Sequence, residues 1–512
     1  MTEPRTPPRW LARTVAALLA VLFVAHVATR DDGIRWNGDA AQYLMHAENL
    51  AAGAPYARTG WLVNTERSLT PPAYPPGYPL ALTPVVAATG RARAPIAALQ
   101  ALFLAALTGL FAALFWRRLA PASVVLLVLL VGLSPFFVGM VSRGLSDVLF
   151  GALVASTLLA FDRAQRATPR RRVWAWALAA GVLAGAAILT RSLGVALLPT
   201  FVIAALLPGR RASLGPAVAA VALAVALAAG VTSGVDWRDG AQILTTEAAE
   251  TGYGEMVRQG LIGRAERIPR FVVERATQYV LSDRSHFWNS LLLPGLGHVP
   301  IRAAGLLLIV AGIWASVRDV RAVDVFAVVY VAALLPWSFG WARYLLPVLP
   351  VFYAYLLLGG ETLWRRARPG GPRLGAGVAI GICALALGAY AAEGVALMAD
   401  RVASGPSAPD DGSELVRQHV PEAAILLTES DPRRFILTTG RTAATVPYDT
   451  TAWNAYAGRL GATHMLVVDD RDAIAAWALR LGWQRVAGSE AADLYATPVG
   501  APAGEPGPEA AP

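Results

Sequence analysis

Long apolar runs separated by short polar turns dominate the chain up to about residue 398. A bilayer core about 30 Å thick is crossed by about 20 apolar residues of α-helix. The runs carry few internal charges, so the pattern predicts an all-α polytopic membrane protein with about 11 transmembrane helices. They cover residues 10–29, 95–115, 121–140, 144–161, 173–190, 192–208, 213–234, 301–317, 323–340, 343–361 and 374–398.

One further apolar segment, residues 74–90, decides the orientation. Four prolines interrupt it, and its uninterrupted part is too short to span. If it is a re-entrant or interfacial helix, five arginine clusters lie on the side of the N-terminus, as the positive-inside rule requires. We therefore expect residues 10–29 to be an uncleaved signal anchor, the N-terminus to be cytoplasmic and the C-terminus to lie outside. The clusters are at 117–118, 163–172, 210–211, 318–321 and 365–373.

The composition supports the membrane assignment and removes several function classes. Hydrophobic residues make up 55% of the 512 positions and charged residues only 15%, whereas a soluble domain carries roughly a quarter charged residues. The sequence contains no lysine, which excludes Walker-type P-loops and lysine Schiff bases. Its one cysteine, Cys383, excludes disulfides within the chain and Cys-based zinc sites. The net charge of +9 is dispersed between apolar runs, so it indicates membrane orientation and no nucleic-acid partner.

The pattern changes after the last apolar run. Short apolar runs alternate with helical stretches there, which predicts a small α/β domain outside the membrane with no recognisable catalytic motif. The predicted organisation is a cytoplasmic N-terminus (1–9), a transmembrane domain (10–398), a linker (399–410), the α/β domain (411–498) and a disordered tail (499–512). Within the transmembrane domain, a first outer loop covers 30–94 and a long outer loop covers 236–300.

Asp39, in the first outer loop, directly precedes a helical pattern. One interpretation is a helix N-cap, because Asp is among the residues preferred there. The other is a general base at the membrane face. The two are compatible, since a capped carboxylate has a fixed orientation.

Several segments, taken in order, resemble a known family. They are QYLMHAENLAAG after Asp39, YPPGYPLAL, SRGLSDVLFGAL, ILTRSLGVALLP and WARYLLPVLPVFYAYLL. Together they look like the polyprenyl-phosphate-sugar dependent glycosyltransferases of the GT-C superfold, similar to dolichyl-phosphate-mannose protein mannosyltransferases and bacterial aminoarabinose transferases. The resemblance covers most of residues 10–400. It implies a multi-pass enzyme of a bacterial cytoplasmic membrane that transfers a hexosyl or pentosyl group, with inversion, to a protein, lipid or cell-envelope glycan.

The resemblance also implies roles for individual residues. Asp39 matches the acidic residue that accepts the acceptor's proton, and Asp147 matches a second acidic position that supports the site or a metal, with helix capping as its alternative. Arg191 and Arg343, with Tyr344, would bind the donor phosphate, because guanidinium groups suit phosphate; interfacial snorkelling is the alternative.

The remaining candidates are a pocket and a metal site. Tyr43, Glu66 and Tyr78 are candidates to line the substrate pocket, although an aromatic belt explains the tyrosines equally well. No cofactor is certain; a divalent metal is left open, with Glu66, Asp147 and His286 as weak candidate ligands.

Two other functions compete with glycosyl transfer. The first is a secondary transporter or lipid flippase, which usually shows internal repeats that this sequence lacks. The second is a non-catalytic scaffold or sensor that uses the C-terminal domain. Deleting the residues after about 400 should abolish a sensor's function, whereas an enzyme should keep basal transfer.

Overall fold

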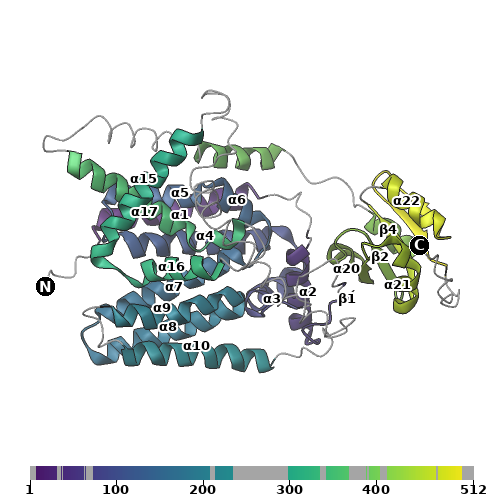
Figure 1. Ribbon diagram of the computed structural model, residues 1–512, viewed down its shortest axis with the longest axis horizontal. Coiled ribbons are helices and arrows are strands. Elements are labelled where there is room, and N and C mark those ends of the chain that lie inside the picture. The colour runs from purple at the N-terminus through teal and green to yellow at the C-terminus, as the bar shows by residue number, and fades with distance from the viewer. Residues whose placement is uncertain are drawn as a thin grey trace, which may run out of the picture.

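The computed structural model describes residues 7–30, 36, 38–62, 64, 73–207, 214–234, 298–334, 342–367, 388, 391–403, 412–468 and 471–498. Figure 1 shows a bundle of helices, with a smaller unit of strands and short helices at one end of it. Glu66, His286, most of the predicted long outer loop and the tail 499–512 lie outside the described residues.

Most helices of the bundle follow the predicted apolar runs. Their bounds are α1 (Arg9–Ala28), α2 (Gly38–Ala52), α3 (Gly77–Thr89), α4 (Arg93–Phe115), α5 (Pro121–Gly132), α6 (Pro135–Ser142), α7 (Asp147–Arg166), α8 (Arg170–Thr190), η1 (Ser192–Ala196), α9 (Leu197–Leu206), α10 (Leu214–Gly234), α15 (His298–Ser316), η5 (Val317–Asp319), α16 (Ala322–Leu334), η6 (Ala342–Leu345) and α17 (Leu349–Ala367). Residues 391–403 are also helical.

Within the described residues, four helices are long and apolar enough to cross a membrane: α1, α4, α8 and α10. The pair α5 and α6, bent by 46°, makes a fifth if it counts as one span. The predicted number of about 11 spans therefore stays a prediction. Helix α3, in the proline-rich segment, has 13 residues, which at 1.5 Å per residue is about 20 Å and shorter than a bilayer core.

Glycines allow pairs of helices to approach closely. A Cβ on Gly312 of α15 would lie 1.9 Å from the carbonyl oxygen of Tyr355 in α17, and one on Gly359 of α17 would lie 1.9 Å from that of Leu308. Gly181 of α8 packs in the same way against the backbone of Ala220 in α10, at 2.7 Å. Small residues at such crossings are typical of membrane helices, where close packing replaces the hydrophobic driving force.

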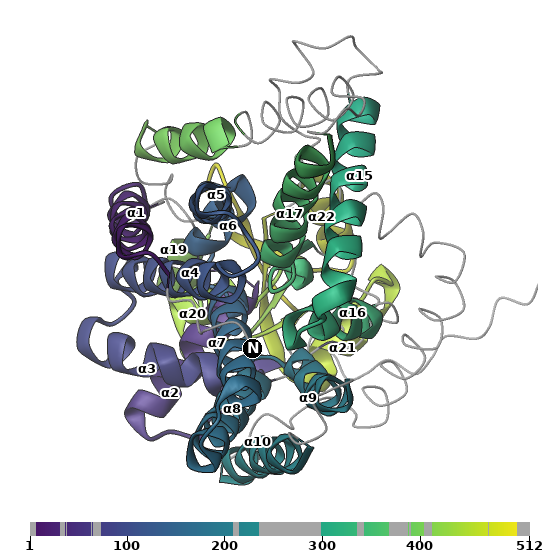
Figure 2. The same ribbon diagram turned by 90° about the vertical axis from the view of Figure 1, so that its left-hand side faces the viewer.

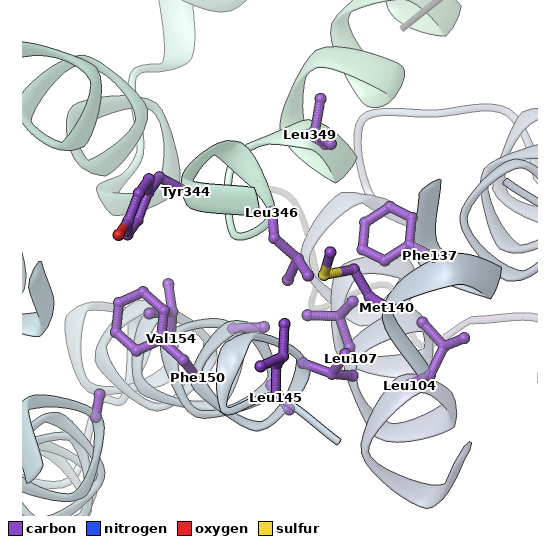
Figure 3. Packing of buried hydrophobic residues seen from close by; sticks show 14 of the residues in the cluster. Leu104, Leu107, Phe137, Met140, Leu145, Phe150, Val154, Tyr344, Leu346 and Leu349 are labelled. Carbon is purple, nitrogen blue, oxygen red and sulfur yellow. The ribbon is translucent and has the colours of Figure 1, made fainter. Parts of the chain in front are cut away.

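Apolar side chains fill the centre of the bundle. Figure 3 shows Leu346 and Leu349, which follow η6, among Leu104 and Leu107 of α4, Met140 of α6 and Phe150 of α7. Leu346 and Leu107 are so close to Gly151 of α7 that a Cβ there would lie 2.7 Å from each. This packing fixes η6 against α7, so the residues at the ends of both elements keep one relative position.

The bundle's arginine-rich turns are linked to one another. Arg118, after α4, forms a bidentate pair with Asp324 of α16, at 2.7 Å for both bonds. The backbone N–H of Ala120 donates to Glu361 of α17 at 2.8 Å, and Arg321 lies close enough to Arg118 and Arg166 to interact electrostatically. The turns at 117–120, 166 and 318–324 therefore share one end of the bundle.

The C-terminal unit is a six-stranded mixed sheet of order β1-β3-β2-β4-β6-β5. The strands are β1 (Trp61–Leu62), β2 (Ile425–Thr428), β3 (Thr442–Thr445), β4 (Ala462–Val467), β5 (Gln484–Gly488) and β6 (Asp493–Ala496), and the helices are α19 (Ser413–His419), α20 (Arg433–Thr439), η7 (Thr450–Ala452), α21 (Trp453–Leu460) and α22 (Arg471–Arg480). Strands β1 to β4 pair in parallel, and β5 and β6 are antiparallel to their neighbours.

The first outer loop contributes an edge strand to this sheet. β1 pairs with β3 across a gap of about 380 residues, and Asn64 donates to the carbonyl oxygen of Thr445 at 2.9 Å. The predicted domain boundary near residue 411 thus separates segments that are hydrogen-bonded to each other. Figures 1 and 2 show that the sheet unit lies beside α2 and α3, at one end of the bundle.

Candidate functional site

Asp39 lies in the first turn of α2 and binds three side chains. Its Oδ2 accepts from Nη2 of Arg343, in η6, at 2.6 Å. Its Oδ1 accepts from the Tyr74 hydroxyl at 2.5 Å and from Nη1 of Arg433, in α20, at 3.3 Å. The carboxylate is 13% exposed. A partly buried carboxylate with cations on both oxygens is fixed in orientation and can still be reached by a small group.

Burial and charge act in opposite directions on Asp39. Burial favours the neutral acid and so raises its pKa, but the positive charges of Arg343 and Arg433 and the hydrogen bond from Tyr74 outweigh burial, and the net pKa is lowered. Asp39 is therefore ionised at neutral pH. Removing one of the cations would raise its pKa and make it a stronger base.

A second ion pair lies next to the first. Arg191, directly after α8, pairs through Nη1 with Oδ1 of Asp147 at 2.8 Å and donates to Ser146 Oγ at 3.2 Å. The side chains of Arg191 and Asp147 are 12% and 2% exposed. The Tyr344 ring connects the two pairs, because its centroid lies 4.9 Å from Cζ of Arg191 and 5.3 Å from Cζ of Arg343.

Two buried polar atoms at these pairs have no hydrogen-bond partner within the described part of the chain. They are Nε of Arg343 and Oδ2 of Asp147. An unsatisfied buried donor or acceptor costs about 1–3 kcal/mol, more when charged. The Nε–H of Arg343 can donate a hydrogen bond to an oxygen of a bound anion, which makes the site suited to phosphate.

Both carboxylates lie inside their helices. Asp147 is the first residue of α7, and Ser146 occupies its N-cap position without a side-chain cap bond. Both oxygens of Asp39 and Oδ1 of Asp147 bind arginines. Neither the capping interpretation of the two acids nor snorkelling of Arg191 and Arg343 therefore describes these side chains. A carboxylate in the first helical turn is also stabilised by the helix dipole.

A tight turn positions Asp147. Gly144, in the SRGLSD segment between α6 and α7, has φ +63°, and a Cβ there would lie 2.5 Å from the Trp36 ring. Both the backbone angle and the indole therefore require glycine. Arg143, beside it, is exposed.

The tyrosines Tyr43 and Tyr78 lie behind the ion pairs. Tyr43, one turn after Asp39, shares a hydrogen bond of 2.9 Å with Ser146 Oγ, and its ring contacts those of Tyr74 and Tyr78 at 4.7 and 5.0 Å. The Tyr78 hydroxyl accepts from Gln100. Both tyrosines are buried. They connect α2 to the turn before α7 and so support the site from inside, rather than forming a belt at the membrane surface.

The contacts bring together most of the residues selected from the sequence. Asp39, Arg343, Tyr344, Arg191, Asp147 and Tyr43 form one connected group, and Tyr78 packs against it. Across the described residues, no group of three His, Cys, Asp or Glu side chains is arranged to hold a metal ion. Asp147, a candidate ligand, binds an arginine, so a divalent cation would compete with a guanidinium there.

Arg433 is the residue of this site that sequence reasoning missed. It was overlooked because the C-terminal segment shows no catalytic motif, yet its Nη1 reaches both Asp39 and Gln42, the latter at 3.1 Å. One local feature could have pointed to it. Arg433 and Arg434 occupy the first turn of α20, where cations are unfavourable because of the helix dipole.

Comparisons with known proteins concern the family and the fold of the chain. Residues 73–234 match the model of the family described as dolichyl-phosphate-mannose-protein mannosyltransferase. This stretch contains Asp147 and Arg191. No curated protein sequence matches the chain.

Two solved structures are similar over nearly the whole chain. One is ArnT from Cupriavidus metallidurans bound to undecaprenyl phosphate, with 16% identity and a TM-score of 0.56, covering 96% of this chain and 98% of ArnT. The other is the archaeal oligosaccharyltransferase AglB from Archaeoglobus fulgidus, in complex with an inhibitory peptide and a dolichol-phosphate. It has 12% identity and a TM-score of 0.57, covering 92% of this chain and 71% of AglB. The resemblance found in the sequence motifs is thereby confirmed, and the chain has the fold of the GT-C superfold membrane enzymes.

Proposed function

We propose that this protein transfers a sugar from a polyprenyl-phosphate-linked donor to an acceptor hydroxyl of a protein, lipid or cell-envelope glycan. One observation carries the proposal: the Asp39 carboxylate is bound to Arg343, whose buried Nε has no partner among the described residues. The carboxylate that would act as the base is thus in direct contact with the guanidinium that would bind the phosphate. The undecaprenyl phosphate in ArnT and the dolichol-phosphate in AglB support a lipid-phosphate donor.

The site's charges suit the exchange of one anion for another. Arg343 is neutralised by Asp39, and Arg191 by Asp147. A donor phosphate placed between the arginines would accept hydrogen bonds from both and weaken the hold of Arg343 on Asp39. The carboxylate would become more basic when the donor is in place, so donor binding itself would prepare the base.

In the reaction, one bond to the anomeric carbon forms while another breaks, and the proton of the acceptor hydroxyl is transferred. The acceptor oxygen attacks the anomeric carbon from the face opposite the phosphate, while the bond from that carbon to the phosphate oxygen breaks. Asp39 takes the hydroxyl proton, and the polyprenyl phosphate leaves with its negative charge held by Arg343 and Arg191. Attack from the opposite face inverts the anomeric configuration.

The arrangement also supports an orientation in the membrane. The arginine-rich turns around Arg118 and Arg321 share one end of the bundle, and Asp39 lies beside the sheet unit at the other end. The positive-inside rule assigns the arginine-rich end to the cytoplasm. The site and the C-terminal sheet would then face outward from a bacterial cytoplasmic membrane.

The test is a transfer assay on the purified full-length protein. A panel of polyprenyl-phosphate sugars is incubated with the protein, with and without chelator, and donor consumption is followed. Asp39→Asn should lower the rate about 10²- to 10⁴-fold, the usual contribution of a general base. Glu48→Gln is the matched control, because Glu48 is an arginine-paired carboxylate on the same helix, bound to Arg91.

Two outcomes would contradict the proposal. Full activity of the Asp39→Asn variant would remove Asp39 as the base. Movement of lipid-linked sugar across proteoliposomes without any transfer would favour the transporter or flippase.

A further inference from the structure

We propose that Arg433 is a positioning residue of the transfer site, through which the C-terminal sheet unit orients the catalytic carboxylate of Asp39. This inference rests on the proposed function, because it takes Asp39 as the base. It assigns to the C-terminal unit a part in catalysis that its sequence does not suggest.

Both edges and one face of the Arg433 guanidinium have partners among the described residues. Nε and Nη2 donate to Asp431 at 2.9 and 2.6 Å, and Nη1 donates to Gln42 and Asp39. The Trp61 ring lies 4.8 Å from its Cζ. The side chain is only 8% exposed. A guanidinium fixed on both edges and one face has a single orientation, so it can hold another group in place.

The helix that carries Arg433 is itself docked firmly. Arg91 donates to the carbonyl oxygen of Leu437 in α20 while it pairs with Glu48 of α2. The β1–β3 pairing ties the first outer loop to the same sheet. The contact between Arg433 and Asp39 is therefore supported by two others: Arg91 links α20 to α2, and β1 links the first outer loop to the sheet.

The two arginines hold different oxygens of Asp39. Arg343 binds Oδ2, and Arg433 binds Oδ1 together with Tyr74. When a donor phosphate draws Arg343 away, Oδ1 is still held by Arg433 and Tyr74. Asp39 then keeps its direction while its Oδ2 becomes free to take a proton. A misplacement of about 1 Å in such a group can cost about a hundredfold in rate.

A purely structural role for Arg433, as a staple between the sheet unit and the bundle, predicts different behaviour. The charged and titratable groups that face Asp39 are Arg343, Arg433, Tyr74 and Tyr43, with Asp431 behind Arg433. Substitutions that change these charges should move the acid limb of the pH profile of kcat/KM, which reports the free enzyme. If Arg433 only links the sheet unit to the bundle, its loss should lower the folded fraction and leave the acid limb of the kcat/KM profile at the same pH.

Two substitutions should move the limb in opposite directions. Arg433→Gln removes a positive charge beside Asp39, raises its pKa and shifts the limb to higher pH. Asp431→Asn leaves the charge of Arg433 uncompensated, lowers the pKa of Asp39 and shifts the limb to lower pH. We expect kcat to fall about 10- to 100-fold for Arg433→Gln, with a smaller fall for Asp431→Asn and little change in the KM for the lipid donor.

Two controls separate positioning from docking. Arg91→Gln removes the other side-chain link between α20 and α2, which does not contact Asp39. This variant should have a lower free energy of unfolding and keep the wild-type pH profile of kcat/KM. Arg434→Gln changes the neighbouring arginine, which lies over the Phe435 ring at 4.4 Å, and should behave as wild type.

The outcomes distinguish this inference from the proposed function. If Asp39→Asn is inactive while Arg433→Gln and Asp431→Asn keep the wild-type kcat and acid limb, Arg433 has no positioning role and the proposed function stands. A second result would also overturn the inference: Arg433→Gln and Asp431→Asn both lose activity, but the acid limb of their kcat/KM profiles stays at the wild-type pH, as expected for Arg91→Gln. If Arg433→Gln does not fold, Asp431→Asn and Arg433→Lys carry the test. Arg433→Lys keeps the charge and should keep the limb near its wild-type position at reduced kcat.

Discussion

Variants of the buried ion pair between Arg191 and Asp147 can separate its contribution to stability from its contribution to sugar transfer. Asp147→Asn would leave the Arg191 charge without its partner where it is 12% exposed. Removing one partner of a buried ion pair costs about 3–5 kcal/mol, because the remaining charge is desolvated and uncompensated. The double variant Arg191→Gln with Asp147→Asn has no such charge, and replacing both partners of a buried pair is often nearly neutral.

The two measurements should therefore diverge. In a detergent denaturation assay, we expect the single variant to lose about 3–5 kcal/mol and the double variant to regain most of it. In the transfer assay, the double variant should stay at least about tenfold below wild type, since one phosphate-binding charge is worth at least about 1.4 kcal/mol in rate.

Asp324→Asn is the matched control at the opposite end of the bundle. Its pair with Arg118 is buried to a similar degree, with side chains 10% and 7% exposed. The variant should be destabilised comparably, yet its folded fraction should transfer sugar at the wild-type rate. Two results would refute the reasoning: a double variant no more stable than Asp147→Asn, or a double variant that recovers wild-type activity together with its stability.

Two further predictions concern the supports of the site. Burial lowers the pKa of His46 to about 4 despite its hydrogen bond to the Tyr56 carbonyl, so the unfolded chain binds more protons between about pH 6.5 and 4. The free energy of unfolding should fall by up to about 3 kcal/mol as pH drops through that window. His46→Gln should lose this part of the pH dependence. An unchanged slope of the free energy of unfolding against pH in that variant would contradict the prediction. Gly144→Ala should cost at least about 1–2 kcal/mol from its positive φ alone, besides the clash with Trp36. Gly139→Ala, which meets no neighbouring atom, is its control in a thermal melt, and equal melting temperatures would refute the argument.

The proposed role of Arg433 also changes how the C-terminal unit should be tested. From the sequence alone, an enzyme should keep basal transfer when the residues after about 400 are deleted. That deletion removes Arg433 from Asp39 and β3 from β1. Loss of activity after truncation therefore does not distinguish a sensor from an enzyme, whereas the point variants Arg433→Gln and Arg91→Gln do.

The amino-acid sequence alone indicates the membrane character, the positions of most helices and four charged residues that the structure brings together. Apolar runs of about 20 residues are a local property, so they can be recognised without knowing what they pack against. Asp147, Arg191 and Arg343 lie at or near the ends of apolar runs, where ionisable residues are costly unless they are used. Asp39 precedes a helical pattern in the first outer loop, and the family resemblance pointed to all four residues.

Which charges meet depends on the packing of distant segments. Arg343 binds Asp39 from about 300 residues away, and Arg433 from 394 positions away. Strand β1 has two residues and finds its partner in the C-terminal sheet. None of these contacts has a local pattern, because each depends on how the helices pack and where their ends come to lie. The sequence therefore indicated the acids and cations of the site, and the fold decided how they pair and added Arg433 from a segment without a motif.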